Sequence, residues 1–155
     1  MPAYVAVRLK GHRRIMATTA DTMKSLRLTR ANHAVVLPHT PEYQGQLLKA
    51  KDYITFGTVE AAEIAALIKS RGRLEGDKPV TDAVVAKGTS FKTIDDFAKA
   101  IASGQAKYAD LKGVTPIFRL HPPRKGLKSL KRAVNEHGDL GNRGEAIKEL
   151  LARMM

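Results

Sequence analysis

The sequence predicts a small α/β fold that ends in a basic extension. Three observations support this prediction: strand and helix patterns alternate in the first third, helical patterns fill the middle third, and the last third joins a basic run to one amphipathic helix. The chain has 155 residues and an apolar fraction of 43%, which is typical of one folded domain. We therefore expect a single domain, 1–155, with a β-α-β-α-β core at 1–57, a helical insert at 58–113, and a basic arm with a closing helix at 114–155.

The first third supplies the core. Segments rich in β-branched or aromatic residues predict strands at Tyr4–Leu9, Ala34–Leu37 and Tyr53–Phe56. Gly57 is expected to end the third strand. Thr18 or Thr19 can cap the first helix, and Thr40 before Pro41 predicts the start of the second. The connections are short, so we expect a small sheet with both helices on one face.

The remaining two thirds predict mainly helices. Helix starts are expected after the threonines Thr58, Thr81 and Thr93. A short strand near Ile117 should end before Pro122 and Pro123, which continue neither a sheet nor a helix. The closing helix carries an apolar stripe at Ile147, Leu150, Leu151 and Met154.

Charge is the strongest functional signal. Lys and Arg total 27 against 15 Asp and Glu, a net charge of +12. The excess lies at the two ends, with +6 for 1–57, +1 for 58–113 and +5 for 114–155. A strongly basic chain of this size favours a polyanionic partner, of which nucleic acid is the most common. The alternative for any single run is a solvated surface charge.

Two basic clusters are the candidates for phosphate contact, because Arg and Lys both bind phosphate oxygens and glycine permits close backbone approach. The first comprises Arg8, Lys10, Gly11, His12, Arg13, Arg14, Arg27, Arg30 and His33. The second comprises Arg119, His121, Arg124, Lys125, Gly126, Lys128, Lys131, Arg132 and Arg143. A weaker third candidate is the pair Arg71 and Arg73.

Other chemistry finds little support in the sequence. The chain has no cysteine, which excludes thiolate metal sites and disulfides and fits a reducing, cytoplasmic location. The five histidines are scattered, so no metal or other cofactor is expected. The spacing of Gly138, Gly141 and Gly144 resembles a nucleotide loop, but turns before the closing helix are the favoured interpretation. A third hypothesis is an enzyme that acts on an anionic substrate, but no arrangement of catalytic residues can be argued from the sequence.

Four ordered segments resemble one family. They read SLRLTRANHAVVLPHTPEYQGQLLKAKDYITFG, LIKSRGRL, PIFRLHPPRKG and GDLGNRGEAIKELLARM. Together they are similar to the archaeal-type large-subunit ribosomal protein L-thirty family, the counterpart of eukaryotic ribosomal protein L-seven. The resemblance covers essentially the whole chain, whereas the bacterial counterpart is similar only to the first third.

The resemblance implies a three-stranded antiparallel sheet in a ferredoxin-like core, with two helices on one face. It also implies a structural, non-enzymatic constituent of the large ribosomal subunit that binds rRNA by phosphate and shape, close to 5S rRNA and to neighbouring ribosomal proteins, and not a membrane or a small molecule. The alternative is a free-standing regulatory or processing factor that binds RNA or DNA. The segment Leu127–His137 is compatible with either an amphipathic helix or an extended arm, which we expect to be mobile in the free protein.

Overall fold

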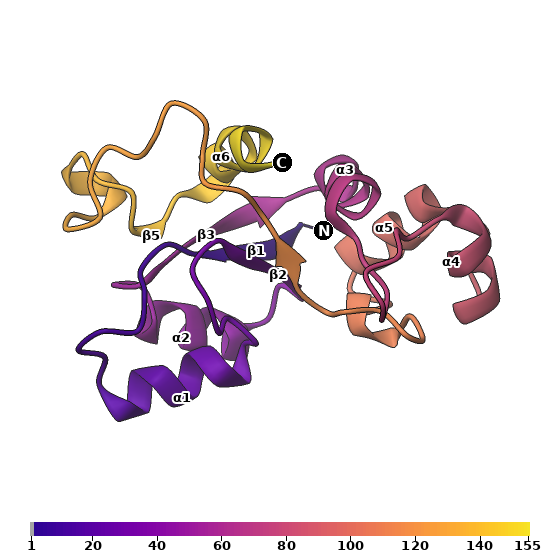
Figure 1. The fold of residues 1–155 in the computed structure, drawn as a ribbon, viewed down its shortest axis with the longest axis horizontal. Coiled ribbons are helices and arrows are strands. Elements are labelled where there is room, and N and C mark those ends of the chain that lie inside the picture. The colour runs from indigo at the N-terminus through magenta and orange to yellow at the C-terminus, as the bar shows by residue number, and fades with distance from the viewer. Residues whose placement is uncertain (1) are drawn as a thin grey trace.

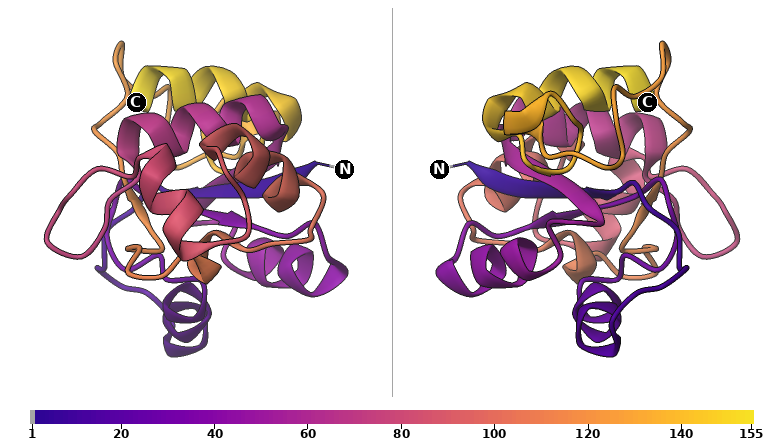
Figure 2. Two further views of the ribbon diagram at one scale, coloured as in Figure 1. Left: turned by 90° about the vertical axis from the view of Figure 1, so that its right-hand side faces the viewer. Right: turned by 90° about the vertical axis from the view of Figure 1, so that its left-hand side faces the viewer.

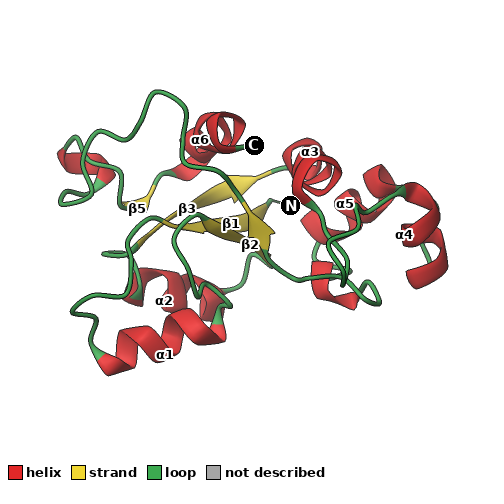
Figure 3. Ribbon diagram, in the orientation of Figure 1, coloured by secondary structure: helices red, strands yellow, loops and turns green. Residues whose placement is uncertain are grey.

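The computed structural model describes residues 2–155, which form a mixed five-stranded sheet between two layers of helices (Figure 1, Figure 3). The strands are β1 (Ala3–Arg8), β2 (His33–Leu37), β3 (Ile54–Val59), β4 (Phe118–Arg119) and β5 (Gly141–Asn142). The α-helices are α1 (Ala17–Ser25), α2 (Pro41–Lys49), α3 (Ala61–Arg71), α4 (Asp82–Gly88), α5 (Ile94–Ala102) and α6 (Ile147–Met154). The 3₁₀ turns are η1 (Tyr108–Asp110), η2 (Val134–Glu136) and η3 (Gly144–Ala146).

The sheet has five strands and not the three expected. Its order is β4-β2-β1-β3-β5, with β1 antiparallel to both β2 and β3. The additional strands are two residues long and come from the last third of the chain. Strand β4 pairs antiparallel with β2, and β5 pairs parallel with β3. Strand β4 confirms the short strand expected near Ile117, whereas β5 was not predicted, because a strand of two residues carries almost no periodic signal.

Helices α1 and α2 lie on one face of the sheet, as expected, and α3, α5 and α6 cover the other face, so the sheet is covered on both sides (Figure 2). Strand β1 shows why, because all six of its residues are buried. Tyr4 and Ala6 pack with α1 and α2, whereas Val5 and Val7 belong to a second apolar cluster with α3, α5 and α6. Side chains alternate between the faces of a strand, so one central strand supplies both cores.

The helix starts follow local capping chemistry. The Thr40 hydroxyl accepts a bond from the Tyr43 N–H at 3.4 Å, and the Thr93 hydroxyl accepts one from the Asp96 N–H at 3.1 Å, as expected. The expected cap at Thr58 is wrong, because Glu60 and Glu63 form a capping box at the start of α3. The expected cap at Thr18 or Thr19 is also wrong, since α1 begins at Ala17 without a side-chain cap.

Gly57 lies inside β3 and does not end it. A Cβ atom there would overlap the carbonyl oxygen of Gly144 and the side chain of Ile147. The glycine therefore permits the start of α6 to lie directly against the sheet. None of the helices described is long and apolar enough to cross a membrane.

Candidate nucleic-acid interface

The loop after β1 is built around the buried side chain of Arg8. Its guanidinium donates to the carbonyl oxygens of Lys10 at 2.8 Å, Leu28 at 2.7 Å and Gly11 at 3.1 Å. Arg8 is only 2% exposed, and burial lowers its pKa without removing a charge that titrates far above neutral pH. This candidate contact residue is therefore used inside the protein, where it fixes the path of the basic loop.

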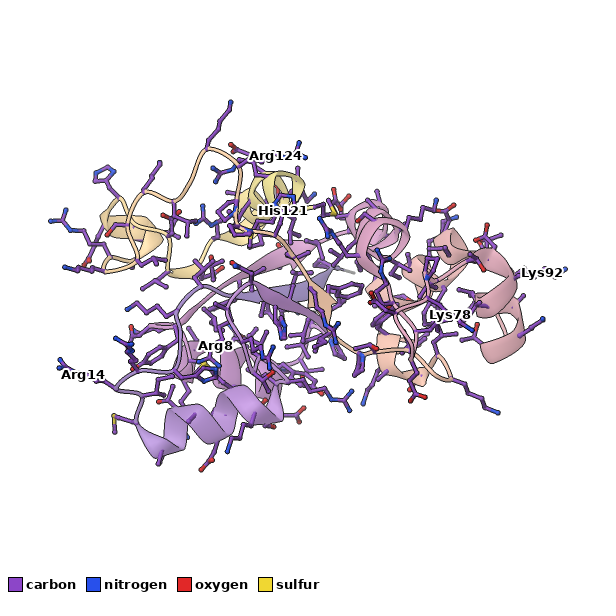
Figure 4. The ribbon with its side chains drawn as sticks, viewed as in Figure 1. Arg8, Arg14, Lys78, Lys92, His121 and Arg124 are labelled. Atoms are coloured by element: carbon purple, nitrogen blue, oxygen red, sulfur yellow. The ribbon has the colours of Figure 1, made fainter. Side chains whose placement is uncertain are left out.

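The loop itself presents its cations to solvent. Gly11, His12, Arg13 and Arg14 are exposed, and the Arg14 side chain projects away from the ribbon, whereas Arg8 lies inside it (Figure 4). Arg14 adopts a left-handed conformation with φ of 57°. Such a conformation is costly for a residue other than glycine and persists where the surrounding structure imposes it.

The two basic clusters meet at one edge of the sheet, a juxtaposition that sequence reasoning did not predict. His33 in β2 lies directly opposite Arg119 in β4, and the exposed Arg27 and Arg30 lie just before His33. The pKa of His33 is lowered by burial and by the positive charges of Arg119, Arg30 and Arg8. The first and second clusters thus meet where His33 lies opposite Arg119, and the surface formed by their exposed residues is called the basic edge below.

The turn at Pro122–Gly126 is anchored on the C-terminal end of α6. The N–H groups of His121 and Arg124 donate to the carbonyl oxygens of Met154 at 3.2 Å and Arg153 at 3.0 Å. Nη1 of Arg153 donates back to the carbonyl oxygens of Arg124 at 3.3 Å and Gly126 at 3.1 Å. These bonds use carbonyls that a helix end leaves without partners, and they hold the exposed side chains of Arg124 and Lys125 outward.

Leu127–His137 forms neither an α-helix nor a simple extended arm. It is a series of turns that contains η2 and is organised by the buried carboxylate of Asp139. This carboxylate accepts bonds from the Lys128 N–H, from the Ser129 N–H at 2.9 Å and from Nη2 of Arg143 at 2.7 Å. Burial alone would raise the pKa of Asp139, but these three hydrogen bonds outweigh it and lower the pKa.

Asp139 is the residue anchoring the arm that sequence reasoning missed. A signal existed, because Asp139 and Glu136 are the only carboxylates between Arg119 and Arg143. Arg143 is 12% exposed at its side chain and also donates from Nε to the Thr55 hydroxyl at 3.3 Å. Its contacts make Arg143 an anchor of the arm, comparable with Arg8 in the first cluster.

The weaker candidates Arg71 and Arg73 lie at the end of α3. Nη2 of Arg71 donates to the carbonyl oxygen of Met155 at 2.7 Å, so its guanidinium ties the last residue of the chain to α3. Arg73 lies 3.9 Å from the exposed carboxylate of Asp77. Both guanidinium groups therefore have partners within the protein.

The remaining cations of the two clusters have no acidic partner. Within residues 2–155, ion pairs are found at Lys69–Asp95, Arg73–Asp77, Lys99–Asp96, Arg143–Asp139 and Lys148 with Glu60 and Glu63. The exposed cations without one include Arg13, Arg14, Arg27, Arg30, Arg119, Arg124, Lys125, Lys128, Lys131 and Arg132. Residues 2–155 also contain no group of three or more His, Asp or Glu side chains placed to hold a metal ion.

Comparison with known proteins found similar sequences. Residues 4–54 match the family model described as "Ribosomal protein L30p/L7e". The chain is 45% identical over 152 residues to "Large ribosomal subunit protein uL30" of Methanobrevibacter smithii, covering 98% of this chain and 99% of that protein. The chain belongs to the uL30 family. A second relative, uL30 of Archaeoglobus fulgidus, is 42% identical over 151 residues, which cover 97% of this chain and 99% of the relative.

Membership confirms the resemblance found in the sequence. A member of the uL30 family is a structural component of the large ribosomal subunit and not an enzyme. The family model covers only the β1 to β3 segment, whereas the archaeal relatives align over nearly the full length, including the turn at Pro122–Gly126 and α6.

Proposed function

We propose that this protein binds large-subunit rRNA through the basic edge, which consists of the loop after β1, the segment from Arg27 to His33, strand β4 and the Pro122–Gly126 turn with its arm. The single observation that carries the proposal is the absence of acidic partners along this edge within residues 2–155. A surface that served only solubility would mix charges of both signs, as the insert does through Lys69–Asp95 and Lys99–Asp96.

The contacts we propose are mainly to phosphate. Aromatic side chains that could stack on bases are scarce in this chain, and Phe56, Phe97 and Phe118 are buried. The exposed guanidinium groups fit phosphate oxygens in a bidentate manner, and the lysines act as mobile charges. Arg8 and Arg143 contribute indirectly, because they hold the loop and the arm in place.

Binding of the isolated protein to large-subunit rRNA tests the proposal. The variant Arg124→Ala/Lys125→Ala/Lys128→Ala removes three exposed charges whose side chains form no ion pair among the described residues. We expect weaker binding, and a slope of log affinity against log salt that is smaller by about two to three, because each lost phosphate contact removes roughly 0.7–0.9. The melting temperature should stay close to that of the parent.

A matched control keeps the loss of net charge equal. Lys87→Ala/Lys92→Ala/Lys112→Ala removes three exposed lysines of the insert, and Lys92 lies far from the basic edge (Figure 4). This control should keep the parent salt slope. Equal losses in the two triple variants would show that net charge alone drives binding, and the proposed interface would then be wrong.

We further propose, from the family resemblance, that the basic edge lies close to 5S rRNA. The chain contains no cysteine, so a single introduced cysteine gives an unambiguous attachment point for a hydroxyl-radical probe. A probe at Ser129→Cys in reconstituted large subunits should cleave large-subunit rRNA and 5S rRNA. Cleavage confined to large-subunit rRNA at sites remote from 5S rRNA would contradict the proposed neighbourhood.

A further inference from the structure

Three exposed cations of the basic edge have a backbone conformation that suits glycine. Arg14, Arg27 and Lys125 have φ of 57°, 62° and 66°. The other residues with positive φ, glycines aside, belong to residue types that tolerate this conformation best, namely Asn32, Asp77 and His137. Within residues 2–155, the unfavourable cases are therefore all long basic side chains on one surface.

Helix α1 ends in a Schellman motif, in which the residue after the C-cap is usually glycine. The N–H of Arg27 donates to the carbonyl oxygen of Lys24 at 2.9 Å. The N–H of Leu28 donates to that of Met23 at 2.8 Å. Helix α5 ends in the same motif, with Gly104 at the equivalent position and φ of 79°. The chain thus uses glycine for this motif in the insert and arginine on the basic edge.

Lys125 repeats this contrast in a tight turn. The N–H of Gly126 donates to the carbonyl oxygen of Pro123 at 3.1 Å, so Lys125 is the third residue of the turn. A positive φ at this position favours glycine. The insert has a turn closed in the same way at 111–114, with a bond of 3.2 Å, and its third residue is Gly113 with φ of 73°.

The fold makes no use of these three basic side chains. All three are exposed, and none takes part in an ion pair or a side-chain hydrogen bond within residues 2–155. At Arg14 only the backbone is used, because the Tyr53 hydroxyl donates to its carbonyl oxygen at 3.5 Å. A residue that breaks a local conformational rule without an internal gain points to a functional position.

We propose that Arg14, Arg27 and Lys125 are the principal rRNA contacts of the basic edge, each binding a phosphate from a position that the fold alone would give to glycine. The hydrogen bonds around each residue fix its backbone before RNA arrives, which lowers the ordering cost of binding. The proposal rests on the proposed rRNA-binding function and ranks these three cations above the other exposed ones. Glycine at these positions should therefore favour the fold and weaken RNA binding.

Glycine substitutions test both halves of this statement. Binding to large-subunit rRNA and thermal unfolding are measured for Arg14→Gly, Arg27→Gly and Lys125→Gly. Each should bind about tenfold more weakly, as expected for one lost hydrogen bond to a charged group, with an equal or higher melting temperature. Arg13→Gly and Arg30→Gly are the controls, because both residues are exposed cations of the basic edge without a positive φ. They should lose less than about threefold in affinity and melt at a lower temperature, since glycine there only adds flexibility.

Two further variants separate the side chain from backbone flexibility and net charge. Arg27→Gly/Gly104→Arg keeps the net charge and exchanges the two Schellman positions. It should bind as weakly as Arg27→Gly and melt at a lower temperature. Arg27→Asn removes the charge but keeps a residue that tolerates positive φ, so its affinity should also fall about tenfold.

Three results would overturn the proposal while leaving the interface intact. They are parent-like binding of the exchange variant or of Arg27→Asn, equal affinity losses in the three glycine variants and the two controls, and melting temperatures of the glycine variants as low as those of the controls. Failure of the parent protein to bind large-subunit rRNA would instead refute the proposed function itself.

Discussion

Replacing Asp139 with asparagine tests whether one carboxylate orders the whole arm. The substitution keeps the shape of the side chain and removes its charge, so it weakens the bonds from the Lys128 and Ser129 N–H groups and the ion pair with Arg143 at 2.7 Å. The Asp139 and Arg143 side chains are only 2% and 12% exposed, so water does not replace what is lost.

The magnitude follows from these contacts. A hydrogen bond to a charged group contributes about 1.5–3 kcal/mol, and breaking a buried ion pair costs about 3–5 kcal/mol. Asparagine retains one acceptor, so we expect a loss of about 3 kcal/mol. If the arm opens as a local unit, this loss corresponds to roughly 100-fold faster hydrogen exchange, since about 1.4 kcal/mol is a factor of ten.

Native-state hydrogen exchange of the Lys128 and Ser129 amides measures the opening of the arm directly, because both N–H groups bond to the Asp139 carboxylate. Thermal unfolding shows whether the loss is local or spreads to the whole chain. Asp77→Asn is the matched control, because Asp77 is 75% exposed and only 3.9 Å from Arg73. An exposed pair of this kind contributes about 0–1 kcal/mol, so the control should stay near the parent. Parent-like exchange of both amides in Asp139→Asn would refute the anchoring role.

Four further outcomes are expected. The folded-state pKa of Asp139 lies below its unfolded value of about 4. The stabilisation that this carboxylate gives is therefore complete above pH 4 or so and is lost as the pH falls towards the folded-state pKa. Hydrogen exchange of the arm amides, followed as the pH is lowered, should show this loss in the parent and not in the asparagine variant. Arg8→Met should destabilise the fold by about 2–4 kcal/mol in denaturant titrations, because three backbone carbonyls lose their donor, and Arg8→Lys should restore only part of it. Arg119→Gln should raise the pKa of His33 in an NMR titration by removing a nearby positive charge, and an unchanged pKa would contradict the joined basic edge. Gly57→Ala should cost about 1–3 kcal/mol through overlap with α6, with parent-like stability as the contradicting result.

The sequence predicted the long elements because each has its own periodicity or cap. The Thr40 cap, the stripe of α6 and the three central strands depend on neighbours within a few residues. The short strand near Ile117 was predicted and is β4, but its pairing with β2 was not, and β5 was not predicted at all. Each of these strands consists of two residues stabilised by partners more than 80 positions away. Gly57 was misread for the same reason, since the atoms that require a glycine belong to Gly144 and Ile147.

The candidate site shows the same division. The sequence indicated the two basic clusters, and the structure shows that most of their basic residues are exposed and without acidic partners. Charge alone could not separate Arg8 and Arg143, which hold the backbone, from arginines such as Arg13 and Arg124, which face solvent. It also could not predict that β4 places Arg119 beside His33 and so joins the two basic clusters into one edge.

The two apolar clusters on opposite faces of the sheet impose an order on the folding of the protein during its synthesis. The cluster beneath α1 and α2 is complete once residue 56 has been made, because its buried members run from Tyr4 to Phe56. The opposite cluster also requires α3, α5, β4 and α6, and its last member is Met154. On the ribosome that synthesises it, this chain should therefore fold first as a half-covered sheet, and the face that carries Val5 and Val7 should be completely covered only after α6 has been made. The segment matched by the family model, residues 4–54, nearly coincides with that early unit.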